Sequence, residues 1–170
     1  MKEIKLAQAK AGDFILVKES AFLSRIIQLG QRLRVSSEFC WCNHAALLVG
    51  YDNTGWKIIE SVKNGPQLSA LSNYRTGSYK VISSNLDDED RKEAVHFAYK
   101  SIGDHYGFLT IASIILNLLT PSSINIDFRR SRTLICSGLV ARALEHGGVV
   151  LPKDPYSTMP ADLAEWAGVK

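Results

Sequence analysis

Cys136 lies where a polar, turn-prone segment gives way to a stretch with the periodicity of an amphipathic helix. Apolar residues recur at helical spacing after it: Leu139, Val140, Ala143 and Leu144. Ser131 and Thr133 are candidate N-caps, so we expect Cys136 in the first helical turn. The positive end of the helix dipole favours a thiolate there, and thiolate is the nucleophilic form of cysteine. Cys136 is therefore a candidate nucleophile.

A cysteine nucleophile needs an imidazole to accept its proton and a further group to orient that imidazole. His44 is the best of four candidates because it begins a nearly all-apolar run, where a polar side chain tends to have a specific role. His146 precedes two glycines at a predicted helix end, where an imidazolium complements the dipole, and His96 falls inside another predicted helix. His105, in a predicted loop, stays open as an alternative.

Glu60 is the candidate partner of His44. The runs 44–50 and 56–61 are typical of two antiparallel strands joined by the turn-prone residues 52–55. Such a hairpin would bring the histidine and the glutamate to the same end of a sheet. The alternative interpretation is a core histidine and an unrelated solvent-exposed glutamate.

The remaining segments predict the elements around this hairpin. Residues 14–18 and 79–83 have the patterns of further strands. Apolar spacing predicts a helix over 22–33, and acidic residues open another that Gly103 should close. Because the strands cluster early in the chain, the pattern favours an α+β fold with an antiparallel sheet packed against helices over a doubly wound parallel sheet.

The composition fits one globular domain spanning residues 1–170, with 46% hydrophobic and 22% charged residues. A net charge of +3 is too small to indicate a nucleic-acid partner. Three cysteines and no signal-peptide pattern predict a reducing, cytoplasmic location, although delivery elsewhere by another route stays open. Two basic clusters are interpreted as solvated faces: Arg25, Arg32 and Arg34, and Arg129, Arg130 and Arg132.

The most apolar segment, 107–119, is too short for a membrane span, and no other segment suggests one. We expect it to be a core helix. The alternative is a helix that lines a groove for an acyl chain.

Several short motifs follow one another in a distinctive order. A first strand preceded by Gly-Asp leads to a His-Ala strand, an Ile-Glu-Ser strand end, a Gly-x-x-Tyr turn and a Cys-Ser-Gly-Leu-Val helix. This ordered set, from about residue 12 to 163 and including the tail 156–163, resembles the permuted papain-fold hydrolases of the YiiX type. These are related to NlpC-type peptidases and to lecithin:retinol acyltransferase. In the permuted order the histidine precedes the cysteine, as it does here.

The resemblance implies a circularly permuted papain-like fold and a cysteine peptidase or amidase that needs no cofactor. It implies that Cys136 is the nucleophile, His44 the base and later the acid, and Glu60 the residue that orients the imidazole. It also implies that Tyr106 helps to bind the substrate or the oxyanion, whereas simple aromatic packing is the alternative role for this residue.

The implied reaction is cleavage of an amide bond, in a peptide or cell-wall-type peptide, through an acyl-enzyme. A small peptide or acyl-amide would be the substrate. Two alternatives remain from the sequence. One is an acyltransferase or a lipid or N-acyl amidase, which would take a lipid-like substrate. The other is a non-catalytic binding module on the same fold.

Two rival sites are weaker. Cys40, Cys42 and His44 alternate, so they could hold zinc on one face if the strand extended backwards, although this spacing is not a common zinc pattern. We therefore expect no metal, and expect the two cysteines to be small buried hydrophobes. Ser137 lacks the Gly-x-Ser-x-Gly spacing of a serine hydrolase.

Overall fold

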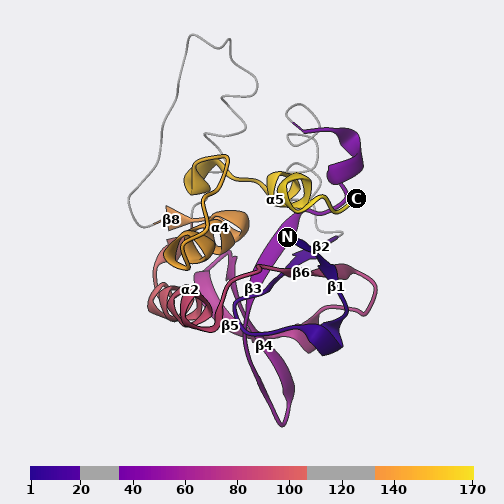
Figure 1. Cartoon of the computed structure of the whole chain (residues 1–170). Helices are drawn as coiled ribbons and strands as arrows, with labels where there is room; N and C mark the ends of the chain where they lie inside the picture. The colour runs from indigo at the N-terminus through magenta and orange to yellow at the C-terminus, as the bar shows by residue number, and fades with distance from the viewer. Residues whose placement is uncertain (20–34, 107–132) are drawn as a thin grey trace.

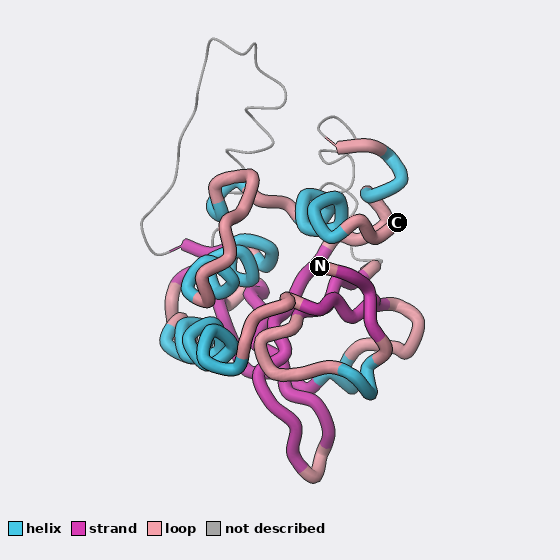
Figure 2. Tube along the Cα trace, viewed as in Figure 1, coloured by secondary structure: helices cyan, strands magenta, loops and turns pink. Residues whose placement is uncertain are grey.

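The computed structural model describes residues 1–19, 35–106 and 133–170 (Figures 1 and 2). Within them, an antiparallel sheet has the strand order β1-β6-β2-β3-β4-β5. Its strands are β1 (Lys2–Ile4), β2 (Phe14–Val17), β3 (His44–Asp52), β4 (Gly55–Val62), β5 (Gly65–Ala70) and β6 (Tyr79–Ser83). A separate parallel pair joins β7 (His105–Tyr106) and β8 (Thr133–Leu134).

The α-helices are α2 (Asp88–Lys100), α4 (Cys136–His146) and α5 (Pro160–Ala167) in the described part of the chain. Short 3-10 turns are η1 (Leu6–Gln8), η2 (Ser37–Phe39), η3 (Leu71–Asn73) and η4 (Pro155–Ser157). Figure 1 shows α2 and α4 together on one side of the sheet. The fold is α+β, as the clustering of the strands predicted.

The sheet is buried on both faces at β3, which explains the unbroken apolar run of that strand. Alternate side chains of β3 point to opposite faces. On one face Ala45, Leu47 and Val49 join a cluster with α2, α4 and α5. On the other face Ala46 and Leu48 join a second cluster with residues of β2, β4 and β6. The register of β3 therefore fixes which of its side chains face the helices.

A buried ion pair fastens α2 to the start of β2. Arg91 Nη1 lies 2.8 Å from Asp13 Oδ1, and that oxygen also accepts from the backbone N–H of Ser84 at 3.0 Å. Arg91 further donates to the carbonyl oxygens of Ala11 and Leu86. Asp13 is only 1% exposed, so these donors satisfy a carboxylate that would otherwise be costly to bury.

Most of the predicted elements are present near their predicted bounds. The strand at 14–18, the hairpin and the strand at 79–83 correspond to β2, to β3 with β4, and to β6. Gly103 has φ of +93°, but α2 ends at Lys100, before that glycine. The predicted helix at 22–33 and the apolar segment 107–119 lie outside the described residues. β1, β5 and α5 were not predicted.

Candidate active site

Cys136 is the first residue of α4, as its sequence context predicted. The N-cap is Ile135, which makes no side-chain capping bond. The proposed N-caps were therefore wrong: Thr133 belongs to β8, and Ser131 lies outside the described residues. No side chain caps the helix, and the backbone N–H of Ser137 in its first turn donates to the sulfur of Cys136.

The segment η4 packs across the first turn of α4. Ser137 Oγ donates to the carbonyl oxygen of Thr158 at 2.6 Å. At Gly138, a Cβ would lie 3.0 Å from the carbonyl oxygen of Pro155, so glycine permits this close approach. Because the hydroxyl of Ser137 is buried and bonded to a carbonyl, this serine holds the turn that carries Cys136 in place. This geometry does not resemble an activated serine nucleophile.

His44 and Glu60 meet at one end of the β3–β4 hairpin. Ala46 of β3 pairs with Glu60 of β4, so these two side chains lie on the same face of the sheet. His44 precedes Ala46 by two residues and therefore shares that face. His44 Nε2 lies 2.9 Å from Glu60 Oε2, and both residues are buried, with 7% and 4% of their surfaces exposed. The expected hairpin geometry is therefore present.

Cys136 completes this cluster from the other side. The His44 and Cys136 side chains share a hydrogen bond, although they are far apart in the sequence. Since Nε2 of His44 faces Glu60, the nitrogen that remains for the thiol is Nδ1. The imidazole thus lies between a sulfur and a carboxylate, which is the order required for proton transfer from a thiol.

The electrostatics of the cluster favour a thiolate and an imidazolium. Burial opposes ionisation of Cys136, but the charge and hydrogen bond of His44 outweigh it, and the backbone N–H groups of Ala45 and Ser137 also contribute, so the pKa of the thiol is lowered. Burial likewise opposes protonation of His44, yet Cys136 and then Glu60 raise the pKa of the imidazole to about 10. Each member of the pair stabilises the charge of the other.

Glu60 remains ionised despite its burial. Burial raises its pKa, but the hydrogen bonds that it accepts from His44, Ser69 and Tyr74 lower the pKa by more, so the net change is a decrease. Tyr74 Oη donates to Oε2 of Glu60. Tyr74 directly follows η3 and was not predicted, because no local pattern in the sequence marks it.

Cys40, Cys42 and His44 do not alternate along one strand. β3 begins at His44, Cys40 lies in a turn and Cys42 lies between that turn and the strand, so the alternation assumed for a zinc site is absent. Cys40 packs with Val35 and Ala161, whereas Cys42 belongs to the cluster beneath the helices. Within the described ranges, no group of three histidine, cysteine or acidic side chains could hold a metal ion. Both cysteines are small buried hydrophobes, as expected.

The other predicted residues lie away from the cluster or outside what the structure describes. His146 ends α4 and stacks on Phe97 with ring centroids 4.2 Å apart, and His96 is exposed on α2. His105 and Tyr106 form β7, but their side chains are not described, so the role of Tyr106 stays a prediction. Both arginine clusters lie outside the described residues.

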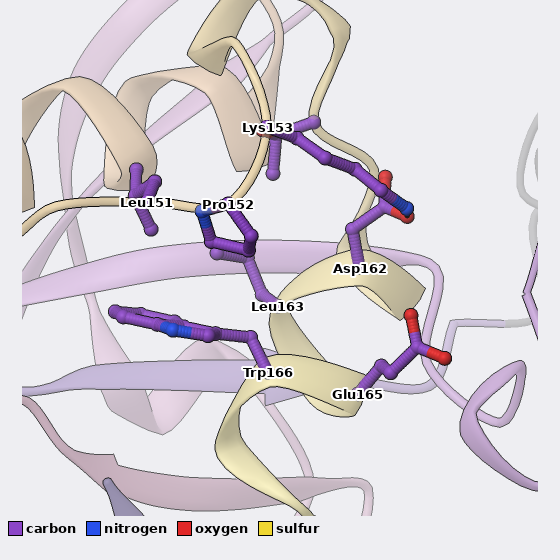
Figure 3. Close-up of a pocket in the computed structure, with 8 residues that line it drawn as sticks. Leu151, Pro152, Lys153, Asp162, Leu163, Glu165 and Trp166 are labelled. Carbon is purple, nitrogen blue, oxygen red and sulfur yellow. Dashed lines mark hydrogen bonds and ion pairs between the residues drawn. The ribbon is translucent and has the colours of Figure 1, made fainter.

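A cavity of about 140 Å³ opens between α5 and the chain that leads to η4 (Figure 3). Leu151, Pro152 and Trp166 form its apolar part, and the ion pair of Lys153 with Asp162 lies at its edge. Neither the thiol, the imidazole nor the carboxylate of the cluster lines it. It is therefore distinct from the candidate active site.

Comparison with known families identifies the chain. Residues 8–159 match the family described as permuted papain-like amidase enzymes, YaeF/YiiX, C92 family. The chain belongs to this family. As a C92 member it is an enzyme, a cysteine hydrolase of the peptidase and amidase kind with a permuted papain-like fold. A search of curated proteins finds no match.

One further property of this C92 member concerns membranes. The described residues contain no helix that is both long enough and apolar enough to cross a bilayer.

Proposed function

We propose that this chain cleaves an amide bond in a peptide or cell-wall-type peptide through a Cys136, His44 and Glu60 triad. The observation that carries the proposal is the buried chain of contacts from the thiol through the imidazole to the carboxylate. Such an arrangement supplies a nucleophile, a base and a group that orients the base.

The first half of the reaction forms an acyl-enzyme. The Cys136 thiolate attacks the amide carbonyl carbon, and the carbonyl π electrons move to the oxygen. The resulting oxyanion accepts hydrogen bonds from backbone N–H groups at the start of α4, where the helix dipole adds to their effect. The His44 imidazolium then gives its proton to the departing amine, and the carbon–nitrogen bond breaks to leave a thioester.

The second half restores the resting enzyme. Neutral His44 takes a proton from water, and the resulting hydroxide attacks the thioester carbonyl. Breaking of the carbon–sulfur bond releases the carboxylic acid and returns the thiolate beside the imidazolium. Glu60 keeps Nε2 of His44 engaged throughout, so that Nδ1 faces the sulfur.

The substrate class is best tested by a panel of short amides, γ-glutamyl peptides and acyl esters. We expect turnover of an amide by the wild-type chain and a loss of at least about 1,000-fold in the Cys136→Ala variant, because the variant has no nucleophile. The Cys42→Ala variant is the matched control and should retain turnover.

The panel also separates the alternatives. Preference for long-chain acyl amides or esters, or transfer of the acyl group to an added amine or alcohol in place of water, would identify a lipid amidase or an acyltransferase instead. Turnover that survives in Cys136→Ala would overturn the triad proposal.

A further inference from the structure

We propose that Tyr74 is a positioning residue of this site, which holds the Glu60 carboxylate in the orientation that the imidazole of His44 requires. The inference rests on the proposed triad and extends it by one residue.

The contacts of Tyr74 support this role directly. Its hydroxyl donates to Oε2 of Glu60, the same oxygen that lies 2.9 Å from Nε2 of His44. Its ring also stacks on the imidazole of His44, with centroids 6.0 Å apart and an interplanar angle of 29°. One side chain thus contacts both the carboxylate and the imidazole, through different parts of its structure.

Two donors on one oxygen restrict the carboxylate more than either would alone. A carboxylate can rotate about its last side-chain bond, and a rotated Glu60 would leave His44 without its partner. The N–H of His44 and the O–H of Tyr74 approach the same oxygen and oppose such a rotation. The Ser69 hydroxyl is a further donor to Glu60, from β5.

The fold brings Tyr74 to this position. β5 pairs with β4 with Gln67 opposite Glu60, and the chain then turns through η3, whose Leu71 is buried in the second cluster. Tyr74 follows at once and packs against that cluster with only part of its surface exposed.

The hydroxyl of Tyr74 remains a donor over the working pH range. Burial and the adjacent Glu60 carboxylate both raise the pKa of the phenol above its ordinary value. Among the described residues, the other ionisable groups that influence this cluster are Glu19, which acts on His44 and Tyr74, and Cys136. Neither can donate to Glu60 in place of the phenol, because Glu19 is acidic and the thiol is engaged with His44.

The test compares Tyr74→Phe with Tyr79→Phe by the pH dependence of Cys136 alkylation with iodoacetamide, read by peptide mass spectrometry. Tyr79 is the matched control because it is also half-buried and packs against the same cluster. Tyr74→Phe keeps the ring but removes one donor from Glu60, so the pKa of Glu60 should rise. Protonated Glu60 no longer stabilises the imidazolium, so the thiolate of Cys136 should form only at higher pH. The pH midpoint at which alkylation of Cys136 sets in should therefore rise by about one unit, and below that midpoint the rate should fall about tenfold.

A double-mutant cycle separates positioning from general structural support. In a Glu60→Gln background, Tyr74→Phe should have little further effect, since Tyr74 acts through Glu60. An equal loss in both backgrounds would overturn the inference, and so would a Tyr74→Phe profile that matches Tyr79→Phe.

Failure of the triad itself would look different. In that case Cys136→Ala would keep its turnover, whereas failure of the Tyr74 inference alone leaves Cys136→Ala inactive and Tyr74→Phe unchanged.

Discussion

Cys42 and Cys136 are two buried thiols of the same chain, with 0% and 5% of their surfaces exposed. Their surroundings nevertheless shift their pKa values in opposite directions. Cys42 lies in the apolar cluster between the sheet and the helices, and burial raises its pKa far above the ordinary value for cysteine. Cys136 has a lowered pKa, although burial also acts against it.

The difference comes from a few polar groups rather than from exposure. Cys42 has its own backbone N–H as a stabilising donor, and this does not compensate for burial. Cys136 has the His44 charge and hydrogen bond, together with the backbone N–H groups of Ala45 and Ser137. A buried cysteine is thus inert or ionised according to the donors directed at its sulfur.

Among the variants, His44→Ala should reduce the difference in reactivity between Cys136 and Cys42 the most. Without the imidazolium, burial dominates at Cys136 as it does at Cys42, and the pKa of Cys136 should rise above that of an ordinary thiol. We expect alkylation of Cys136 at mildly acidic pH to fall by about 100-fold or more. Rates of iodoacetamide labelling measure this, and an unchanged rate would show that the helix terminus alone sustains the thiolate.

Glu60→Gln should have an intermediate effect, on the upper limb of the pH profile. Glu60 helps to raise the pKa of His44 to about 10. The stabilisation of the imidazolium is therefore fully present below the ordinary pKa of histidine, and it is lost as the pH rises through about 10. With a neutral amide, the upper midpoint of kcat/KM should move to lower pH, and activity near neutral pH should fall about tenfold. An upper midpoint that does not move would exclude Glu60 as the partner of the imidazole.

The smallest effect on reactivity is expected from Cys42→Ala. This substitution removes a buried sulfur from the apolar cluster and should cost about 1 to 2 kcal/mol of unfolding free energy, measured by denaturant titration. The midpoint for alkylation of Cys136 should stay the same. A shifted midpoint would mean that the two thiols are coupled more strongly than their surroundings indicate.

The sequence predicts the three members of the cluster but not the donors that tune them. Cys136, His44 and Glu60 could be found because a helix start and a two-strand hairpin are local patterns with known geometry. The backbone N–H of Ala45 beside the sulfur could not, since it depends on how α4 packs against β3. Tyr74 was missed for a similar reason, because it reaches Glu60 only through the return of the chain along β5.

The missed elements have physical reasons of their own. β5 begins with Gly65 and Pro66, residues that oppose a strand assignment, and it forms because it pairs with β4. α5 begins with a proline in its first turn, a position that suits a helix start. Because the preceding segment is also rich in prolines, the sequence pattern there favours a loop. The N-cap of α4 was misplaced because the short strand β8 occupies the position of Thr133.

The most direct test of the account is the pH dependence of alkylation of Cys136 and Cys42 in the native wild-type chain. Iodoacetamide labelling, read separately for the two peptides, shows which thiol reacts, and for a thiol that reacts it gives a midpoint that does not depend on how easily the reagent enters. We predict that Cys136 reacts with a midpoint well below that of an ordinary cysteine, and that Cys42 stays unmodified until the chain is unfolded. If Cys136 instead titrates like an ordinary thiol and reacts no faster than Cys42, the thiolate–imidazolium pair at the centre of the account is contradicted.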